Sequence, residues 1–272
     1  MPELPEVETT ARGIAPHLTG ARITGVSVRE PRLRRPVPAD LASRLHDRTL
    51  LAVSRRAKYL QFDFGTGQLL IHLGMSGSLR IISPETPVTA HDHVDLCFGD
   101  RVLRYRDPRR FGLMLWLTPG EEATHPLLAP LGIEPLCATF DGHWLYRATR
   151  EARRPIKSFI MDSHRIVGVG NIYASESLFR AGIHPLAIAG RLGPARCERL
   201  AGAIRDTLRD AIAAGGSSLR DFVRTDGQPG YFQQQYFVYG RDGEPCRHCG
   251  RPVERMVIGQ RASFLCTQCQ RR

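Results

Sequence analysis

Four cysteines near the carboxyl end constrain the fold of this chain more than any other feature of its sequence. Two C-x2-C pairs, Cys246 with Cys249 and Cys266 with Cys269, are separated by 16 residues. Two such pairs can supply the four thiolates of a tetrahedral zinc site, and the spacer is long enough for a hairpin that returns the second pair. The pattern predicts a zinc ribbon with one structural zinc ion, because four protein thiolates leave no position for water or substrate.

Other cysteine chemistries fit this pattern less well. A redox site would need only one C-x2-C pair, and the scattered Cys97, Cys137 and Cys197 argue against a disulfide framework. We expect these three to be buried or inert thiols, and His248 to take no part in metal binding. The hairpin between the two pairs contains Arg261, which a rigid loop would present at the surface.

The overall composition is that of a folded protein. Of the 272 residues, 42% are hydrophobic and 24% are charged, which is enough to bury one large core or two smaller ones. No stretch approaches the roughly 18 to 20 consecutive apolar residues of a membrane helix, and the acidic residues 1–6 are unlike a basic, apolar secretory leader. We therefore expect a cytoplasmic protein.

Positive charge is unevenly distributed and is carried almost entirely by arginine. The chain has 38 basic and 27 acidic residues, a net charge of +11, and Lys58 and Lys157 are its two lysines. Up to Pro135 there are 17 basic and 15 acidic residues, and from Leu136 onward there are 21 and 12. A one-sided basic field predicts a polyanionic partner, most often nucleic acid, because contacts to phosphates release counterions. The alternative is that the charge serves solubility alone.

The first part of the chain has the periodicity of β-structure. Residues 20–117 contain alternating, β-rich runs with short turns, among them a two-residue hairpin signal at Gly99-Asp100. This pattern predicts a β-sandwich or a barrel. A short helix is expected before it, from Pro5 to Leu18, with Pro and Glu residues where a helix start favours them.

The second part is helical. Residues 118–151 are rich in loop-forming residues, and the hydrophobic period beyond them changes towards that of helices. The most regular helix is predicted from Ala195 to Ala214, where apolar residues form one stripe between Pro194 and the pair Gly215-Gly216.

The amino terminus is a candidate reactive group. Methionine is normally removed before a small second residue, which would leave Pro2 as a secondary amine. The pKa of a free α-amino group is roughly 7.7 to 8.0, so a useful fraction is neutral and nucleophilic near neutral pH. Attack on a sugar C1′ would give an iminium, and Glu3 and Glu6 lie close enough in sequence to carry protons. The alternative is a flexible proline start with glutamates that favour the helix dipole.

The chain resembles bacterial formamidopyrimidine-DNA glycosylases in a series of short motifs that run in order from its first residue to about residue 270. They are M-P-E-L-P-E-V-E-T from residue 1, R-R-A-K-Y from 55, H-L-G-M-S-G from 72, H-D-H-V from 91, D-P-R-R-F-G from 107, G-V-G-N-I-Y-A-S-E from 168, D-G-Q-P-G-Y-F from 226 and the two cysteine pairs. One motif would be weak support, whereas the ordered set is highly specific.

The resemblance implies a bifunctional enzyme of base-excision DNA repair. Such an enzyme is a glycosylase that removes oxidised purines, chiefly 8-oxoguanine and formamidopyrimidines, from double-stranded DNA, and a lyase that cleaves the strand by β,δ-elimination. The implied fold is α+β, with an N-terminal β-sandwich and short N-terminal helix, a C-terminal helix–two-turns–helix domain and a zinc ribbon. We place these domains at residues 1–135, 136–232 and 233–272, and expect a monomer.

The resemblance also implies catalytic roles. Pro2 corresponds to the Schiff-base nucleophile and Glu3 to the acid that assists base loss and ring opening. Lys58 corresponds to the proton donor for β-elimination and Arg261 to the one for δ-elimination. An ammonium group can donate a proton, whereas a guanidinium with a pKa above about 12 does so poorly, so we expect Arg261 mainly to bind a phosphate and stabilise developing charge.

Three further residues are implied to fill the gap that an extruded base leaves in the duplex. By resemblance, Met75 and Phe111 insert into the gap, and Arg109 hydrogen-bonds the orphaned cytosine. The alternative is that Met75 and Phe111 are core residues at strand ends. Gly74 and Gly77 on either side of Met75 favour an exposed loop tip.

Other DNA contacts follow from the same resemblance. His91, Arg153 and Lys157 are implied to contact DNA, and Asn171 to hold a phosphate at a helix start. Arg153 stands where the family often has lysine, a change that phosphate binding tolerates. Residues 226–232 resemble a mobile loop that closes over an extruded purine, and are otherwise an ordinary surface loop.

Two rival functions remain open at this point. An endonuclease-VIII-type glycosylase would share the Pro2-Glu3 start and the zinc ribbon but would prefer oxidised pyrimidines. The set Met75, Arg109 and Phe111 favours the purine enzyme. A non-catalytic zinc-ribbon DNA-binding protein is the rival from another class, and it would form no covalent adduct with DNA.

Overall fold

The computed structural model describes residues 1–216 and 235–272, and the chain divides into two compact units. Met1–Ala129 forms the body of the first unit, together with Ala214, Gly215 and Gly216. Pro130–Ala213 and the described carboxyl-terminal residues form the second unit. The domain limits expected at residues 135 and 232 stay predictions, and the latter lies outside the described residues.

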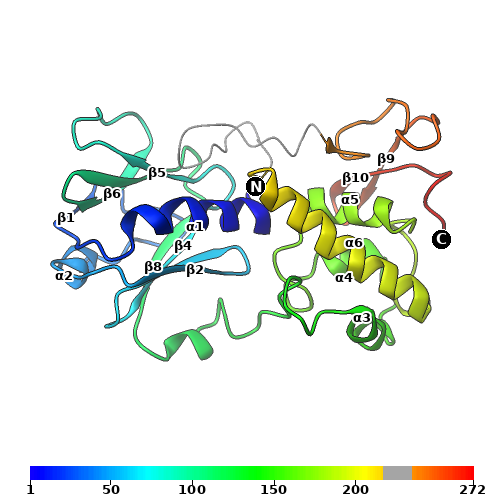
Figure 1. Ribbon diagram of the computed structural model, residues 1–272, viewed down its shortest axis with the longest axis horizontal. Helices are drawn as coiled ribbons and strands as arrows, with labels where there is room; N and C mark the ends of the chain where they lie inside the picture. The colour runs from blue at the N-terminus through cyan, green and yellow to red at the C-terminus, as the bar shows by residue number, and fades with distance from the viewer. Residues whose placement is uncertain (217–234) are drawn as a thin grey trace. The chain divides into compact units, whose positions relative to one another are not determined.

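The first unit contains two antiparallel four-stranded sheets (Figure 1). One sheet has the order β1-β6-β7-β5, with β1 (Gly25–Val28), β6 (Asp92–Phe98), β7 (Arg101–Arg106) and β5 (Ser78–Ile82). The other has the order β2-β3-β4-β8, with β2 (Ala52–Arg56), β3 (Tyr59–Asp63), β4 (Gln68–His72) and β8 (Leu113–Leu117). Two short elements, α2 (Leu41–Leu45) and η1 (Glu121–Ala123), complete the unit.

Alternating side chains from both sheets build a single core, which makes this unit a β-sandwich. On β3, Leu60 and Phe62 are buried while their neighbours are partly exposed. They belong to one buried cluster with Leu96 and Leu103 of the other sheet. The hairpin predicted at Gly99-Asp100 joins β6 to β7, and the expectation of a sandwich or barrel is confirmed as a sandwich.

Helix α1 (Leu4–Leu18) supplies one further side of this core. Its buried Val7, Ala11, Ile14 and Leu18 recur at helical spacing, and all four join the cluster of the two sheets. The predicted helix from Pro5 to Leu18 is therefore confirmed, with one additional residue at its start. Because the helix begins at residue 4, its packing fixes the position of the amino terminus.

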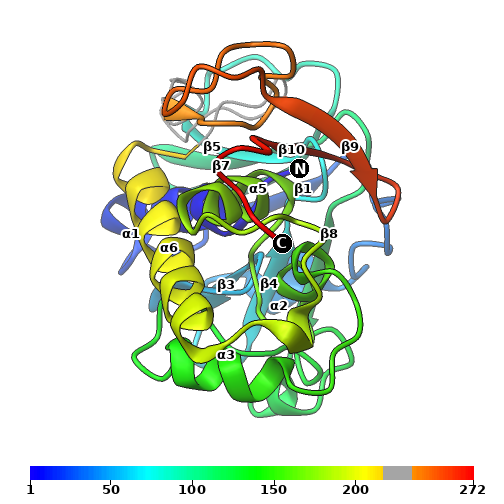
Figure 2. The ribbon, with the colours of Figure 1, turned by 90° about the vertical axis from the view of Figure 1, so that its right-hand side faces the viewer.

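The second unit is built on helices and short connections (Figure 2). Its elements are α3 (Gly142–Thr149), α4 (Ile156–Ile160), α5 (Asn171–Arg180), η2 (Ala189–Arg191) and α6 (Pro194–Ala213). Both α3 and α5 pack against α6, whose buried stripe includes Leu200, Ile204 and Leu208. This helix confirms the prediction for residues 195–214 to within one residue at each end, and Gly215 follows it with a positive φ of 78°.

A two-stranded hairpin completes the second unit. Strands β9 (Glu254–Ile258) and β10 (Arg261–Leu265) pair antiparallel, with Arg261 opposite Ile258. The two turn residues, Gly259 and Gln260, have φ of 54° and 63°, as a tight hairpin turn of the mirror-image type requires. The hairpin lies between the two cysteine pairs in sequence, as predicted.

Among the described residues, no helix combines the length and the apolar character needed to cross a membrane.

Candidate functional site

The amino terminus is held by the start of α1. Pro2 is buried, and Glu3 is 3% exposed at the N-cap position. Glu6, which is fully buried, accepts a hydrogen bond from the backbone N–H of Glu3 at 2.8 Å and forms a capping box with it. The predicted nucleophile and its acid neighbour therefore lie on a fixed segment rather than on a frayed terminus.

Lys58 occupies a tight turn that is joined to the same helix. The turn links β2 to β3 through Ala57, which is buried and has a positive φ of 54°, and Lys58 is half-buried. Arg55 donates one hydrogen bond to the carbonyl of Ala57 at 2.8 Å and another to Glu8 of α1 at 2.9 Å. One guanidinium thus connects the helix that carries Pro2 and Glu3 to the turn that carries Lys58.

His72 adds a neutral ring beside this turn. It ends β4 opposite Tyr59, the residue after Lys58, and the two ring centroids are 4.9 Å apart. Burial lowers the pKa of His72 to about 3, helped by the positive charges of Arg34 and Lys58. The neutral ring accepts a hydrogen bond at Nδ1 from the backbone N–H of Gly74 at 2.9 Å. His72 therefore links the Lys58 turn to the loop that carries Met75.

Met75, Arg109 and Phe111 lie at exposed loop positions. Met75 is 39% exposed and Phe111 is 44% exposed, which argues against core positions at strand ends. The guanidinium carbon of Arg109 lies 4.8 Å from the centre of the Phe111 ring. Large apolar side chains that remain exposed in this way are available for a partner.

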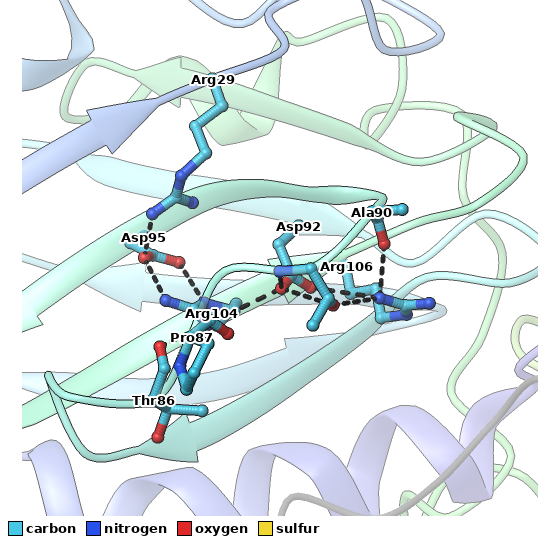
Figure 3. A network of polar contacts seen from close by, with 9 residues as sticks. Arg29, Thr86, Pro87, Ala90, Asp92, Asp95, Arg104 and Arg106 are labelled. Atoms are coloured by element: carbon cyan, nitrogen blue, oxygen red, sulfur yellow. Dashed lines mark hydrogen bonds and ion pairs between the residues drawn. The ribbon is translucent and has the colours of Figure 1, made fainter.

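His91 lies in the segment between β5 and β6, in a left-handed backbone conformation with a φ of 74°. Such a conformation is strained for a residue with a β-carbon and persists where neighbours fix it. Arg106 donates hydrogen bonds to the carbonyl of Ala90 and to the hydroxyl of Thr89, and Asp92 accepts two more from Thr89 (Figure 3).

A second arginine holds the beginning of that segment. Arg104, 7% exposed, donates two hydrogen bonds to Asp95 at 2.9 Å each and further ones to the carbonyls of Thr86 and Pro87 (Figure 3). Arg29 approaches the same Asp95 carboxylate. The segment before His91 is therefore held to the sheet by hydrogen bonds from Arg104 and Arg106, two arginines that are themselves ion-paired to carboxylates of β6.

In the second unit, Lys157 is buried among hydrogen-bond acceptors. Its side chain is on α4, the residue is 1% exposed, and Nζ donates to Asn171 Oδ1 at 2.7 Å, Ser263 Oγ at 2.6 Å and the carbonyl of Ala262 at 3.3 Å. Asn171 Nδ2 donates to the same carbonyl at 2.8 Å. In this arrangement the ammonium holds β10 to α4 and α5, and the expected contact of Lys157 with DNA stays a prediction.

Arg261 and Arg153 are both exposed. Arg261 follows the hairpin turn at the start of β10, one residue before the segment that Lys157 and Asn171 hold. Arg153 borders a cavity of about 650 Å³. The charged residues that line this cavity are Arg147, Arg150, Arg153, Arg154, Arg165, Glu151 and Asp162. Five arginines against two acids give it a net positive charge suited to phosphate.

The four cysteines converge as the spacing predicts. Their sulfur atoms all lie within 4.8 Å of one another, with Cys246 and Cys269 at 3.9 Å and Cys249 and Cys266 at 3.4 Å. Four sulfurs at about 2.3 Å from a tetrahedral zinc ion would be about 3.8 Å apart, so the set fits that ion. The chain therefore has a site for one structural zinc ion beneath the hairpin that presents Arg261.

Comparison with known proteins first gives the class of this chain, a DNA glycosylase of the helix–two-turns–helix type with a zinc ribbon. Residues 1–114 match the formamidopyrimidine-DNA glycosylase N-terminal domain, residues 131–223 its H2TH domain, and residues 243–272 the zinc finger found in FPG and IleRS. The chain belongs to the formamidopyrimidine-DNA glycosylase family. Its fold class, the α+β arrangement expected from the sequence, is confirmed.

Relatives match over their full length. The chain is 62% identical to the formamidopyrimidine-DNA glycosylase of Aromatoleum aromaticum and 59% identical to that of Thioalkalivibrio sulfidiphilus, each covering 100% of both chains. Among solved structures, the MutM (Fpg) protein of Thermus thermophilus is 40% identical with a TM-score of 0.89, over 99% of this chain and 98% of that one. A Lactococcus lactis Fpg mutant in complex with Fapy-dG containing DNA is 32% identical with a TM-score of 0.93, over 100% of both chains.

Several residues organise the site through contacts that their type and spacing in the sequence do not predict. Asp107, Ser76 and Arg55 lie inside the quoted motifs, yet their types are equally common on protein surfaces. Glu8 lies four residues before Arg12, a spacing that suggests a helix-surface pair rather than its second contact to Arg55. The expected lesion loop, residues 226–232, lies outside the described residues.

We expect the ring of His72 to titrate near pH 3, far below its ordinary 6.5. The unfolded chain would bind this proton near 6.5, so the free energy of unfolding falls as the pH drops from about 6.5 towards 3. Proton NMR of the histidine ring signals, assigned with His72→Gln, measures this pKa directly. A His72 signal that titrates near 6.5 would contradict the assignment.

We expect Cys249→Ser to lower the zinc content well below one ion per chain, because the three remaining thiolates bind the ion less tightly. Without the ion the hairpin is no longer fixed, and tight DNA binding should be abolished. Atomic absorption and a duplex-binding titration measure the two effects. Cys137→Ser is the matched control, since Cys137 lies far from the cluster in sequence and is not one of its members. Full zinc occupancy in Cys249→Ser would refute the four-thiolate site.

Proposed function

We propose that this formamidopyrimidine-DNA glycosylase removes 8-oxoguanine and formamidopyrimidines from duplex DNA with Pro2 as its nucleophile. Family membership supports the activity, and relatives of known structure bind Fapy-dG containing DNA and abasic-site DNA. The observation that carries the role of Pro2 is its place at the capped start of α1, which Glu8 and Arg55 join to the turn of Lys58.

The reaction uses the Pro2 nitrogen as a secondary amine once Met1, which is 36% exposed, has been removed. Its lone pair forms a bond to the sugar C1′, the bond from C1′ to the base breaks, and the base leaves with the proton that the Pro2 nitrogen gives up. The C1′–O4′ bond then opens to an iminium while Glu3 supplies the proton to O4′. A C2′ proton passes to water as the C3′–O bond breaks and the 3′ phosphate departs. A C4′ proton is lost to water in the same way as the C5′–O bond breaks and the 5′ phosphate departs, and hydrolysis of the iminium frees Pro2.

Lys58 is the proton donor that we assign to β-elimination. The strained turn that carries this half-buried lysine is joined to α1 through Arg55. The nearby His72 ring is neutral and adds no second positive charge beside it. An arginine at this place would keep its proton throughout.

Arg261 is proposed to hold a phosphate during δ-elimination. It is exposed at a rigid hairpin turn above the zinc site, and the adjoining Ala262 is held by Lys157 and Asn171. In this assignment Lys157 acts through the hairpin, and Asn171 combines that task with a place at the start of α5, where free N–H groups favour a phosphate.

The exposed loop residues are proposed to contact the DNA around the lesion. Met75 and Phe111 fill the gap left by the extruded base, and Arg109 hydrogen-bonds the orphaned cytosine. His91 and Arg153 contact the DNA backbone, and the basic cavity beside Arg153 supports that role. We also propose that the enzyme works as a monomer in the cytoplasm, associated with the nucleoid through its DNA binding.

Borohydride trapping tests the nucleophile and the substrate together. We expect the wild-type chain to form a covalent adduct with duplex DNA bearing 8-oxoguanine opposite cytosine, and Pro2→Gly to form far less, because the secondary amine is lost. Mass spectrometry of the adduct should place it on residue 2 without Met1. An undiminished adduct in Pro2→Gly would remove Pro2 from the mechanism, and faster release of thymine glycol than of 8-oxoguanine would favour a pyrimidine enzyme.

Lys58→Arg separates proton chemistry from charge. We expect this variant to retain much of its affinity for DNA and to lose strand cleavage by at least about tenfold, because a guanidinium with a pKa above about 12 donates a proton poorly. Gel assays of strand cleavage and a binding titration on the same duplex measure the two properties. Cleavage at the wild-type rate would show that Lys58 serves only as a cation.

A further inference from the structure

One buried carboxylate joins the loop of Met75 to the loop of Arg109 and Phe111. Asp107 is fully buried, and its Oδ1 accepts a hydrogen bond from the hydroxyl of Ser76 at 2.7 Å. Its Oδ2 accepts from the backbone N–H of Gly112 at 2.9 Å. Ser76 Oγ in turn accepts from the backbone N–H of Arg109 at 3.2 Å. Each loop is therefore tied to the other within two residues of its exposed tip.

Tyr105 completes the set of donors around this carboxylate. Its hydroxyl donates to Asp107 Oδ2 at 3.0 Å, and burial raises the pKa of Tyr105, with a further contribution from the Asp107 charge. The phenol is therefore protonated at neutral pH and donates its proton to the carboxylate. Hydrogen bonds to a carboxylate are stronger than those between neutral groups, and the low dielectric of the interior strengthens them further.

The backbones of the two loops also pack closely against each other at two glycines. A β-carbon placed on Gly74, beside Met75, would lie 2.4 Å from the Gly112 nitrogen and from the Phe111 carbonyl carbon. One placed on Gly112 would lie 1.8 Å from the Tyr105 hydroxyl. Both positions admit only glycine without a backbone shift, which explains why the loops can approach so closely.

The backbone of the same residue reaches the third DNA-contacting element. The Asp107 N–H donates to the carbonyl of His91 at 3.1 Å, and the Asp107 carbonyl lies 2.8 Å from His93 Nε2. His91 is the residue with the strained backbone described above. One residue thus contacts all three segments of the first unit that carry proposed DNA contacts.

We infer that Asp107 is the positioning residue that sets the gap-filling side chains Met75, Arg109 and Phe111, together with His91, in one arrangement before DNA binds. This inference rests on the proposed function of those side chains. Side chains that insert into the duplex stabilise an extruded base only if they are already in place before DNA binds. The entropy lost in ordering two free loops on binding would otherwise offset the free energy that the inserted side chains contribute.

Asp107→Asn tests the inference, because an amide keeps the size but replaces one acceptor oxygen with a donor. If the amide oxygen faces the Gly112 N–H and the Tyr105 hydroxyl, the NH2 group faces Ser76 Oγ, where it competes with the Arg109 N–H for the same oxygen. We expect excision of 8-oxoguanine from duplex DNA to slow by about 10- to 100-fold, the effect typical of misplaced positioning groups. The preference for cytosine over adenine opposite the lesion should fall towards unity.

A second substrate distinguishes misplaced loops from a general loss of folding, because misfolded protein would lose activity on both substrates. Single-stranded DNA with an abasic site has no base to extrude and no gap to fill, so its cleavage through Pro2 should stay near the wild-type rate in Asp107→Asn. The control is Leu96→Ala, which weakens the core of the same unit at a residue of β6 that is 1% exposed and makes none of the hydrogen bonds of Asp107. Its losses should be equal on both substrates.

Ser76→Ala keeps the inference testable if Asp107→Asn folds poorly, since it deletes only the link between Asp107 and the Arg109 backbone. We expect the same selective loss on duplex DNA, smaller in size. Equal losses on duplex and single-stranded substrates in both variants, or wild-type rates on both, would overturn the inference. Failure of the wild-type chain to form any trapped adduct would instead overturn the proposed function.

Discussion

The capping box between Glu3 and Glu6 is the interaction on which the proposed chemistry of Pro2 depends. A nucleophile that is an α-amino group must stand at the end of the chain, and chain ends fray unless the fold holds them. Here Glu6 accepts the Glu3 N–H at 2.8 Å from a fully buried position, and α1 contributes four apolar residues to the sandwich core. The amino terminus is therefore fixed by the packing of α1 in the core.

The same device recurs at other places where the fold holds a functional segment. Asp107 accepts the N–H of Gly112 beneath the gap-filling loops. In the second unit, Glu176 of α5 accepts the three successive N–H groups of residues 237–239, just before the zinc ribbon, and burial raises its pKa despite these bonds. A buried carboxylate costs desolvation, and several backbone donors repay that cost while they fix a loop that has no regular partner.

Sequence reasoning reached the parts of this structure that local pattern determines. The helix ending before Gly215, the hairpin at Gly99-Asp100 and the convergence of four cysteines all follow from short-range spacing. The burial of Lys157 could not be predicted from short-range spacing, because its acceptor Ser263 lies 106 residues away in the sequence. The link from Ser76 to Asp107 spans 31 residues and has the same character. Motifs indicated which residues matter, and tertiary contacts decide what each one does.

The two lysines in a chain that otherwise uses arginine illustrate that difference. For Lys157 the reason is geometric: a compact ammonium fits between the Asn171 amide, the Ser263 hydroxyl and the Ala262 carbonyl, and a planar guanidinium would not match three acceptors that surround one nitrogen. Lys58 is half-buried on a strained turn beside the neutral His72, and its proposed role is to donate a proton, which an arginine would do poorly. Arginine therefore serves where a permanent charge is enough, and lysine remains where size or a mobile proton decides.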